Sequence, residues 1–338
     1  MNLLPSGIFK LRSKFLYELR KLLSDEGFLE IDTPSYKKIV GMEPYLDPFE
    51  VSSPNKKEKG YLITSPEYSL KMAMSTGLDR IYEIAHVYRS GEEGSSIHSP
   101  EFLMLEMYVA NWDEFQMMDF CDQLIDHLSF QIQTEAHSFQ SESYSRKPET
   151  NRLEKGILTQ MSKSPKLPKH RYTNHEIFLQ TTGRGWSRTE LVETLSEKKI
   201  SFSIEDRYED LYYLVFLNLV EPNLSSGLVY LYDYPPECAA LAKVENGIAR
   251  RFEIYWDGVE LANAFFELAD SFEQRTRFSS EQVLRAELGK EVFPIDEDFL
   301  SCLELGFPKK CTGISLGLDR LLMKILGKNR LNEVSPYQ

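Results

Sequence analysis

Residues 80–108 read RIYEIAHVYRSGEEGSSIHSPEFLMLEMY, and the rest of the chain is organised around this segment. β-Branched and aromatic residues predict strands over Ile81 to Tyr88 and over Phe102 to Val109, joined by a loop of glycines, acids and serines. Side chains alternate along a strand, so Phe102, Glu106 and Tyr108 share one face. An aromatic ring, a carboxylate and a phenol in one row predict a slot for an elongated ligand with a cationic end.

The same pattern has a second interpretation. The segment could be an ordinary core hairpin in which Glu106 pairs with an internal lysine or arginine. Arg89, which closes an apolar strand, and Glu106, which interrupts another, are the two residues that simple packing does not explain. From this segment alone both interpretations stay open.

The composition is that of a globular protein with a sizeable core. The 338 residues are 42% hydrophobic and 27% charged. A formal net charge of −13 argues against general binding of polyanions. The cysteines at 121, 238, 302 and 311 form no C-x-x-C pair, which predicts free thiols in a reducing compartment. The sequence contains no signal peptide or long apolar span, so we expect a cytoplasmic protein that does not bind membranes.

Hairpins flanked by helical patterns predict an α+β fold with one mainly antiparallel sheet, formed by a single domain over 1–338. Segment 35–59 is expected to be irregular, and 133–172, rich in Ser, Lys, Glu and Pro, to be an exposed insertion or mobile loop. Apolar periodicity predicts a helix before Gly27 and helices over 65–74, 112–132, 188–197, 207–220 and 272–288. Strands are predicted over 28–34, 61–64 and 228–232.

A second hairpin, over 251–268, carries paired acids. Asp257-Gly258 is a strong signal for a two-residue turn. With that turn Glu253 faces Ala262, so Glu253 and Glu260 are diagonal neighbours roughly 7 Å apart. Two such carboxylates repel each other unless a cation lies between them, and oxygen ligands suit Mg²⁺. The alternative is an exposed acidic pair on a solvent-facing side of the sheet.

Three more residues of this hairpin could reach the same site, but in a regular strand they have the opposite parity to Glu260: Asn263, Phe265 and Glu267. They can share its face only if one extra residue interrupts the strand. We therefore predict a β-bulge near Leu261 or Ala262.

A third segment, CTGISLGLDRLLMKILG at 311–327, is predicted to pass from a strand into a helix. Gly313 and Gly317 would let the backbone approach a ligand closely, and Arg320 lies one turn into the helix. Glycine in a strand is often a simple irregularity, so this segment is weak by itself. The histidines show no metal-ligand spacing, and the sequence contains no G-x-S-x-G, Walker or G-x-G-x-x-G motif.

Together these segments resemble the three signature motifs of class II aminoacyl-tRNA synthetases, in detail those of the lysyl branch. The helix and GFLEIDTP ending at Pro34 are similar to motif 1, which builds the dimer interface in that family, so the resemblance implies a homodimer. YRSGEEGSSIHSPEF with LMLEMY is similar to motif 2, and GISLGLDRLLM to motif 3. SPE at 65–67 is also similar to the lysyl enzymes. The resemblance covers most of the chain, apart from roughly 133–172.

Lysyl-tRNA synthetases carry an anticodon-binding domain ahead of motif 1, whereas this sequence begins almost at the motif 1 helix. A catalytic core alone resembles the elongation factor P β-lysine ligases, paralogues that activate (R)-β-lysine and transfer it to a lysine of elongation factor P. Ser315 agrees, since the tRNA synthetases have glycine there and the paralogues a small non-glycine residue. The resemblance implies ATP, Mg²⁺, a lysine-like amino acid and elongation factor P as acceptor, with no role for tRNA.

The resemblance also implies roles in ATP binding. Arg89 would bind the α-phosphate and Arg320 the γ-phosphate, both as catalytic residues, and adenine would stack on Phe102. Mg²⁺ would be held by Glu253 and Glu260. The other implied ATP-binding residues are Glu92, His98, Leu261 and Gly317, with Glu260 again among them.

For the amino acid, the resemblance implies that Glu67 receives the backbone-side amine. The pocket for the side-chain ammonium would be lined by Glu106, Tyr108, Asn263, Phe265 and Glu267. Two small polar residues complete the implied set of substrate-binding positions: Ser65 and Ser315.

The chain departs from the family within these motifs. The loop after Arg89 is one residue longer than usual and lacks the customary second arginine, while Ser99 replaces an asparagine and Ala264 a glycine. Three rival functions stay open: ligation of α-lysine or another amino acid to tRNA or a carrier protein, a catalytically silent regulatory paralogue, and a scaffold that binds no nucleotide. The last requires that Phe102 be buried by protein.

Overall fold

The structure is a computed structural model that describes residues 4–92, 94–145, 167–224 and 226–335. Two sheets form within these residues, and their strands are β1 (Leu29–Glu30), β2 (Tyr36–Lys37), β3 (Glu50–Ser52), β4 (Lys59–Leu62), β5 (Arg80–Tyr88), β6 (Glu101–Ala110), β7 (Lys169–Thr173), β8 (Leu228–Tyr234), β9 (Val244–Glu245), β10 (Ile248–Trp256), β11 (Val259–Phe266) and β12 (Cys311–Gly317). The helices are α1 (Ser6–Asp25), α2 (Glu67–Met74), α3 (Glu114–Ser145), α5 (Asn174–Thr182), α6 (Arg188–Lys198), α7 (Tyr208–Val215), α8 (Ser271–Glu287), α9 (Glu297–Leu305) and α10 (Leu318–Ile325).

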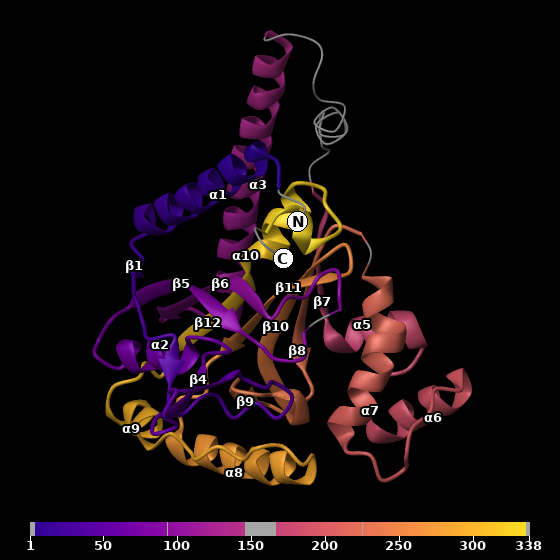
Figure 1. The fold of residues 1–338 in the computed structure, drawn as a ribbon. Coiled ribbons are helices and arrows are strands. Elements are labelled where there is room, and N and C mark those ends of the chain that lie inside the picture. Colours follow the sequence, from indigo (N-terminus) through magenta and orange to yellow (C-terminus); the bar gives the residue numbers. More distant parts are fainter. Residues whose placement is uncertain (1–3, 93, 146–166, 225, 336–338) are drawn as a thin grey trace.

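One large, mainly antiparallel sheet forms the centre of the molecule, which confirms the predicted α+β class. Among the described residues it has nine strands in the order β1-β5-β6-β12-β11-β10-β8-β7, with β9 beside β10. The outer pairs β1–β5 and β7–β8 are parallel, and the pairs between them are antiparallel. Helices α1 and α3 lie above the sheet in Figure 1, and α8 and α9 lie below it.

Alternation along β6 divides the core into two layers. Leu105 and Met107 pack with α1, α3 and α10 in one hydrophobic cluster. Tyr108 belongs to a different cluster, built on α2, α8 and α9. Because Glu106 shares the parity of Tyr108, it also points toward the α2 side of the sheet. Strand alternation therefore places the predicted ligand row on the side covered by α2, α8 and α9.

The second predicted hairpin forms with the predicted bulge. Asp257 and Gly258 have φ of 43° and 73°, as a two-residue hairpin turn requires. Tyr255 pairs with Glu260 and Ile254 with Ala262, so Leu261 is the extra residue.

This bulge also corrects one expected pair. Glu253 faces Asn263 and not Ala262, because the extra residue shifts the register beyond the turn. Glu260 and Asn263 consequently lie on one face of β11.

Several other predicted elements differ from the structure. Helix α3 continues to Ser145 and β7 begins at Lys169, so both ends of the expected loop at 133–172 are regular structure. The middle of that segment, 146–166, lies outside the described residues. Segment 35–59 is not wholly irregular, since β2 and β3 flank β4 in a three-stranded sheet. Helices α5 and α9 were not predicted. Tertiary pairing and packing decide such short elements more than local propensity does.

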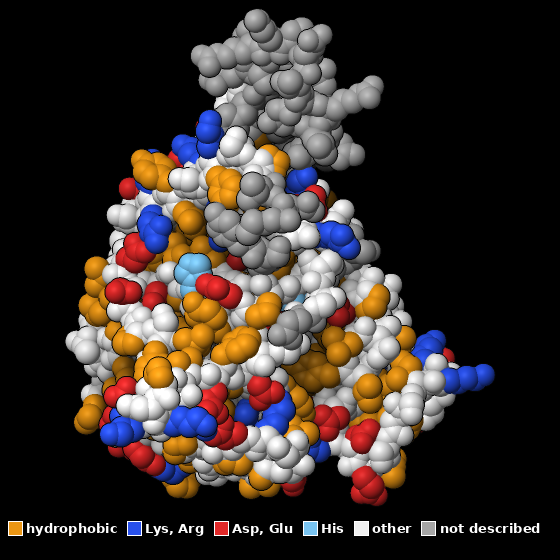
Figure 2. Space-filling model, in the orientation of Figure 1, with side chains coloured by type: hydrophobic (Ala, Val, Ile, Leu, Met, Phe, Trp, Pro, Cys, Tyr) orange, Lys and Arg blue, Asp and Glu red, His pale blue; other side chains and the backbone are white. Residues whose placement is uncertain are grey.

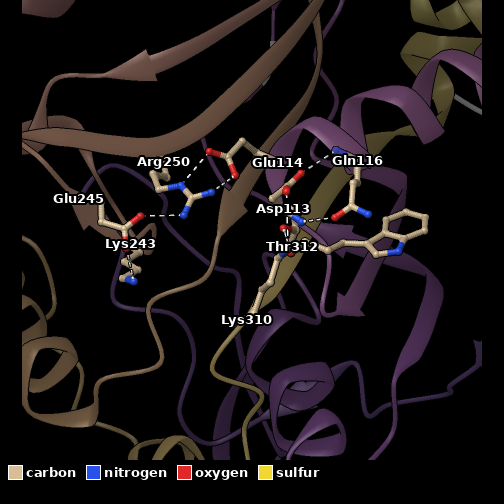
Figure 3. Close-up of polar contacts among 9 residues, drawn as sticks. Asp113, Glu114, Gln116, Lys243, Glu245, Arg250, Lys310 and Thr312 are labelled. Atoms are coloured by element: carbon tan, nitrogen blue, oxygen red, sulfur yellow. Dashed lines mark hydrogen bonds and ion pairs between the residues drawn. The ribbon is translucent and has the colours of Figure 1, made fainter.

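Charged side chains fix the start of α3 against the sheet (Figure 3). Arg250 on β10 donates two hydrogen bonds to the buried carboxylate of Glu114, of 2.8 and 2.6 Å, and a third of 2.8 Å to Glu245. Its guanidinium also lies 3.8 Å from the ring centroid of Phe266. This bidentate geometry is among the stronger side-chain interactions and orients the hairpin that carries Glu253 and Glu260.

The four cysteines are unpaired, as predicted. Among the described residues no helix has the length and apolarity needed to cross a bilayer. On the face drawn in Figure 2, basic side chains are scattered among acidic and apolar ones.

Candidate active site

A cavity of about 420 Å³ opens where β6, β11 and β12 meet α2 and the loop after β5. This volume lies within the range typical of small-molecule sites. Residues that are far apart in the sequence line it together, because adjacent strands of one sheet bring their same-parity side chains to one face. The predicted site residues that line it are Ser65, Glu67, Arg89, Glu92, His98, Phe102, Glu260, Leu261, Asn263, Phe265, Ser315, Gly317 and Arg320.

Two guanidinium groups and an aromatic ring are among the side chains that line the cavity. The Arg89 guanidinium is 5.2 Å from the centroid of the Phe102 ring, and its Nε donates to the Thr64 carbonyl at 3.4 Å. Arg320 donates to the backbone carbonyls of Ile97 at 3.0 Å and Glu260 at 2.9 Å, which fixes its direction. Two oriented cations beside an accessible ring can bind a phosphorylated aromatic ligand.

Phe102 is half-buried and lines the cavity, so protein does not bury it. The scaffold that binds no nucleotide required the opposite. This observation therefore counts against that rival.

The loop after Arg89, where the chain departs from the family, forms a wall of the same cavity. His98 Nδ1 lies 2.8 Å from the Ser95 hydroxyl, and its Nε2 lies 3.6 Å from Glu92 Oε2. Burial, together with the positive charge of Arg320, lowers the pKa of His98. Ser99 lines the wall, whereas Ala264 belongs to the hydrophobic cluster on the opposite side of the sheet. The alanine therefore leaves the shape of the cavity wall unchanged at that point.

The paired acids are not an exposed patch, which removes the alternative considered for them. Glu253 is buried, and its Oε2 accepts hydrogen bonds from Tyr234 at 2.6 Å and Tyr255 at 2.7 Å. Its Oε1 accepts from Arg251 at 2.5 Å. Burial, reinforced by the charge of Glu253, raises the pKa of Glu260 to about 7.

These environments affect cation binding differently. A cation near Glu260 would offset the cost of its burial, so that carboxylate suits a metal ion. Glu253 already has protein donors on both oxygens. Among the described residues no group of three or more His, Cys, Asp or Glu is arranged around a common metal position.

Acidic and polar side chains form another part of the site. The Ser65 hydroxyl donates to Glu106 at 2.7 Å and accepts from the backbone N–H of Glu67 at 3.0 Å. Tyr108 donates to the second oxygen of Glu106 at 2.6 Å. Burial raises the pKa of Glu106 to about 7. In register, Glu106 lies opposite Ser315, whose side chain bonds to it.

Four predicted residues do not line the cavity but lie directly behind its wall: Glu106, Tyr108, Glu253 and Glu267. Among the described residues Glu106 bonds to Ser65, Tyr108 and Ser315, and not to an internal lysine or arginine as the core interpretation predicted. The internal lysine is Lys71, and it pairs instead with Glu67 and Glu267, at 2.6 Å each.

The cavity has lining residues that were not predicted. Glu43 comes from the irregular stretch before β3, while Phe278 and Glu281 are three residues apart on α8. Burial and the nearby charge of Glu43 raise the pKa of Glu281 to about 8. The spacing on α8 would have placed Phe278 and Glu281 on one helix face, but no local signal indicates which sheet that face covers.

Comparison with known proteins agrees with this geometry. The family model described as tRNA synthetases class II (D, K and N) matches residues 5–338. The chain belongs to the class II tRNA synthetase family. It is also similar to curated proteins named elongation factor P–(R)-β-lysine ligase. The protein from Edwardsiella ictaluri is 33% identical, that from Proteus mirabilis 32% and that from Salmonella arizonae 31%, each over 96% of this chain and 93% of the relative.

In this class II synthetase chain, motif 2 and motif 3 are neighbours in space. Strands β6 and β12 pair directly, with Ser315 opposite Glu106 and Gly313 opposite Tyr108. Strand β11 pairs with the other side of β12. The three segments singled out in the sequence therefore form adjacent strands of one sheet.

Proposed function

We propose that this protein activates (R)-β-lysine as an adenylate with ATP and transfers it to a lysine of elongation factor P. One observation carries the proposal. A single cavity is lined both by two arginines with Phe102 and by Ser65, Glu67 and Ser315. Class II family membership and the names of the relatives agree with a ligase of this type.

In the first step the substrate carboxylate attacks the α-phosphorus of ATP. A bond forms between the carboxylate oxygen and phosphorus, the bond to the bridging oxygen breaks, and pyrophosphate leaves. The carboxylate is already ionised at neutral pH, so no general base is needed. Arg89 and Arg320 would align the phosphates and neutralise their developing charge, with Phe102 stacked on adenine. Glu92, His98, Leu261 and Gly317 complete the proposed ATP site.

A metal ion fits this site at Glu260. Its buried carboxylate has a raised pKa and faces the cavity, so it would gain from a cation. Glu253 would contribute from behind, sharing oxygens with Tyr234, Tyr255 and Arg251. When bound, Mg²⁺ supplies positive charge to phosphate oxygens.

The amino acid would lie with its displaced amine toward Glu67. Its side-chain ammonium would lie toward Glu106 and Glu267, between Asn263 and Phe265 and above Tyr108. Ser315 adds a side chain where the tRNA-charging relatives have glycine, which disfavours an α-amine and leaves room for a shifted one. The competing substrate is α-lysine, and pyrophosphate exchange distinguishes it from (R)-β-lysine.

In the second step an acceptor amine attacks the acyl carbon of the adenylate, AMP leaves, and an amide forms. A protein lysine must lose its proton first, since an ammonium is not nucleophilic. Elongation factor P is the proposed acceptor, and tRNA is not.

Pyrophosphate exchange tests the activation step directly. Purified protein is assayed with (R)-β-lysine and, separately, with α-lysine, and exchange is expected to be stronger with (R)-β-lysine. Glu260→Gln should lower that exchange by about 10²-fold or more, because it removes charge where the transition state needs it. Absence of exchange with both amino acids would refute the enzyme and favour a silent paralogue. Stronger exchange with α-lysine, or charging of tRNA, would favour the rival ligase.

Transfer is tested by incubating the protein with elongation factor P, ATP and the amino acid, and measuring the mass of the factor by mass spectrometry.

We also propose a single catalytic domain, a cytoplasmic location and a homodimer through the motif 1 helix. Helix α1 exposes Phe9 and, at 60%, Tyr17. A monomer in light scattering would contradict the dimer.

A further inference from the structure

A buried lysine connects the acidic residues behind the cavity wall. Lys71 on α2 is 2% exposed, and its Nζ lies 2.6 Å from Glu67 Oε1 and 2.6 Å from Glu267 Oε2. The same ammonium lies 5.8 Å from the centroid of the Tyr108 ring. Tyr108 in turn donates to Glu106. Lys71 therefore pairs with two carboxylates. The resemblance implied that Glu67 binds the backbone-side amine of the substrate and that Glu267 helps to bind its side-chain ammonium.

The charges in this group do not balance. The buried carboxyl groups are those of Glu67, Glu106 and Glu267, and the one ammonium among them is that of Lys71. With every group ionised the net charge is −2. A substrate with two ammonium groups would neutralise it, whereas a monoamine would leave one buried charge uncompensated, which is strongly disfavoured.

Glu267 independently indicates a missing partner. Its side chain is 1% exposed and its Oε2 contacts the Lys71 ammonium at 2.6 Å, but its Oε1 has no hydrogen-bond partner within the described residues. Buried carboxylate oxygens normally have donors, so this one lacks a donor that a ligand could supply.

Gly313 leaves space for the Glu267 carboxylate. A Cβ added to Gly313 would lie 2.3 Å from Glu267 Oε1 and 2.3 Å from Tyr108 Cε1. The sheet at this point therefore accommodates Glu267 and Tyr108 and excludes any larger residue.

We propose that Lys71 is a positioning residue that holds Glu267 in place and favours its ionised form, so that the pocket can present carboxylates to both amines of a diamino acid. This inference rests on the proposed function, because it concerns the amino-acid end of the same cavity. Lys71 is not among the residues that line the cavity, so it would not contact the reacting carboxylate or the phosphates. Its replacement should therefore change amino-acid binding and leave the chemical step nearly unchanged.

Protonation of Glu267 should control the binding of the amino acid. Burial raises the pKa of Glu267 to about 8, and the charge of Lys71 opposes that rise. Removing Lys71 should raise this pKa further. The other titratable groups facing Lys71 or Glu267 from the packed elements are Glu67, Glu106, Tyr108, Glu43 and Cys311.

The positive charge of the ligand determines how its affinity changes with pH. A protonated carboxyl binds an ammonium weakly, so the affinity for a diamino acid should improve as pH rises through the pKa of Glu267. In Lys71→Met the same improvement should occur at higher pH.

The experiment measures kcat and the KM for the diamino acid in pyrophosphate exchange, from about pH 6 to about pH 9. Lys71→Met should raise KM near neutral pH by about tenfold for each unit by which the pKa of Glu267 moves, with kcat changed less than about threefold. Its KM should approach that of the parent at the alkaline end. Lys71→Arg, which keeps the charge, should restore most of the parent profile.

A matched control exists on α1. Lys14 also forms an i,i+4 pair, with Glu18 at 2.7 Å, but it is partly exposed and distant in sequence from the cavity. Lys14→Met should leave both the KM profile and kcat unchanged. If Lys71→Met lowers kcat and raises KM by the same factor at every pH, the proposal is overturned, because such a change indicates a structural role only.

A second readout does not depend on the proposed function. Infrared spectroscopy of the ligand-free protein follows buried carboxyl groups as they lose protons, and Lys71→Met should move that step to higher pH. If Lys71→Met does not fold, Glu267→Gln in the parent should abolish the step, and persistence of the step would refute the assignment. A parent without exchange would refute the proposed function, while the infrared titration would still decide the role of Lys71.

Discussion

Replacing Gly313 by alanine should destabilise the sheet at the amino-acid end of the site. The added Cβ would lie 2.3 Å from Glu267 Oε1 and 2.3 Å from the Tyr108 ring, both far inside van der Waals contact. Neither neighbour can move freely, because Lys71 holds Glu267 and Tyr108 is bonded to Glu106. Overpacking of this kind costs about 1–3 kcal/mol.

Gly317, on the same strand, provides the matched control. A Cβ there would lie 3.7 Å from the nearest atom, the Leu261 carbonyl oxygen, which is ordinary contact. Neither glycine has the positive φ that would strain an alanine. Without a clash, Gly→Ala gains about 0.4–1 kcal/mol through the unfolded chain, but Gly317 is also the N-cap of α10, where alanine is less favourable than glycine, so Gly317→Ala should be close to neutral. The free energies of unfolding of Gly313→Ala and Gly317→Ala should therefore differ by about 1–3 kcal/mol.

Urea unfolding monitored by circular dichroism measures this difference, with midpoints compared at one pH. The KM for the amino acid should also rise in Gly313→Ala, because Glu267 or Tyr108 must shift. If Gly313→Ala is as stable as Gly317→Ala, then the close packing of Glu267 and Tyr108 against β12 is wrong.

Three further changes have expected outcomes. Arg251→Met should lower the free energy of unfolding by about 3–5 kcal/mol, because it leaves buried Glu253 without its cation. Arg275→Met breaks an exposed pair and should cost less than about 1 kcal/mol, and the urea midpoints of the two variants measure the difference. Phe102→Ala should raise the KM for ATP about 5- to 150-fold through loss of stacking, with little change in the KM for the amino acid; an equal rise in both would contradict the adenine assignment. Glu281 has a pKa raised to about 8 by burial, so the folded state holds a proton that the unfolded state loses, and stability should fall as pH rises from about 5 to about 8. Glu106, Glu260 and Glu267 have raised pKa values too, so Glu281→Gln should reduce the slope of melting temperature against pH without removing it, and an unchanged slope would refute the assignment.

The local sequence already determined the two central hairpins and the faces they present. Period-two alternation placed Phe102, Glu106 and Tyr108 on one side of β6, and Asp257-Gly258 set the turn of the second hairpin. Even the bulge at Leu261 followed from the sequence, because without it Glu260 and Asn263 would have opposite parity. These features depend on backbone geometry and side-chain period, which are local properties.

Tertiary structure alone decided which charges meet. Glu67 and Lys71 are four residues apart on one helix, so their pairing is local, but only the approach of α2 to the end of β11 brings Lys71 to Glu267. The same holds for Glu253, because its partner Tyr234 comes from the paired strand β8 while Arg251 is two residues away on its own strand, and for Glu281 on α8. Periodicity indicates which face of an element is buried but not what covers it, and the pKa of a carboxyl group depends on the charges and the burial that the covering element supplies.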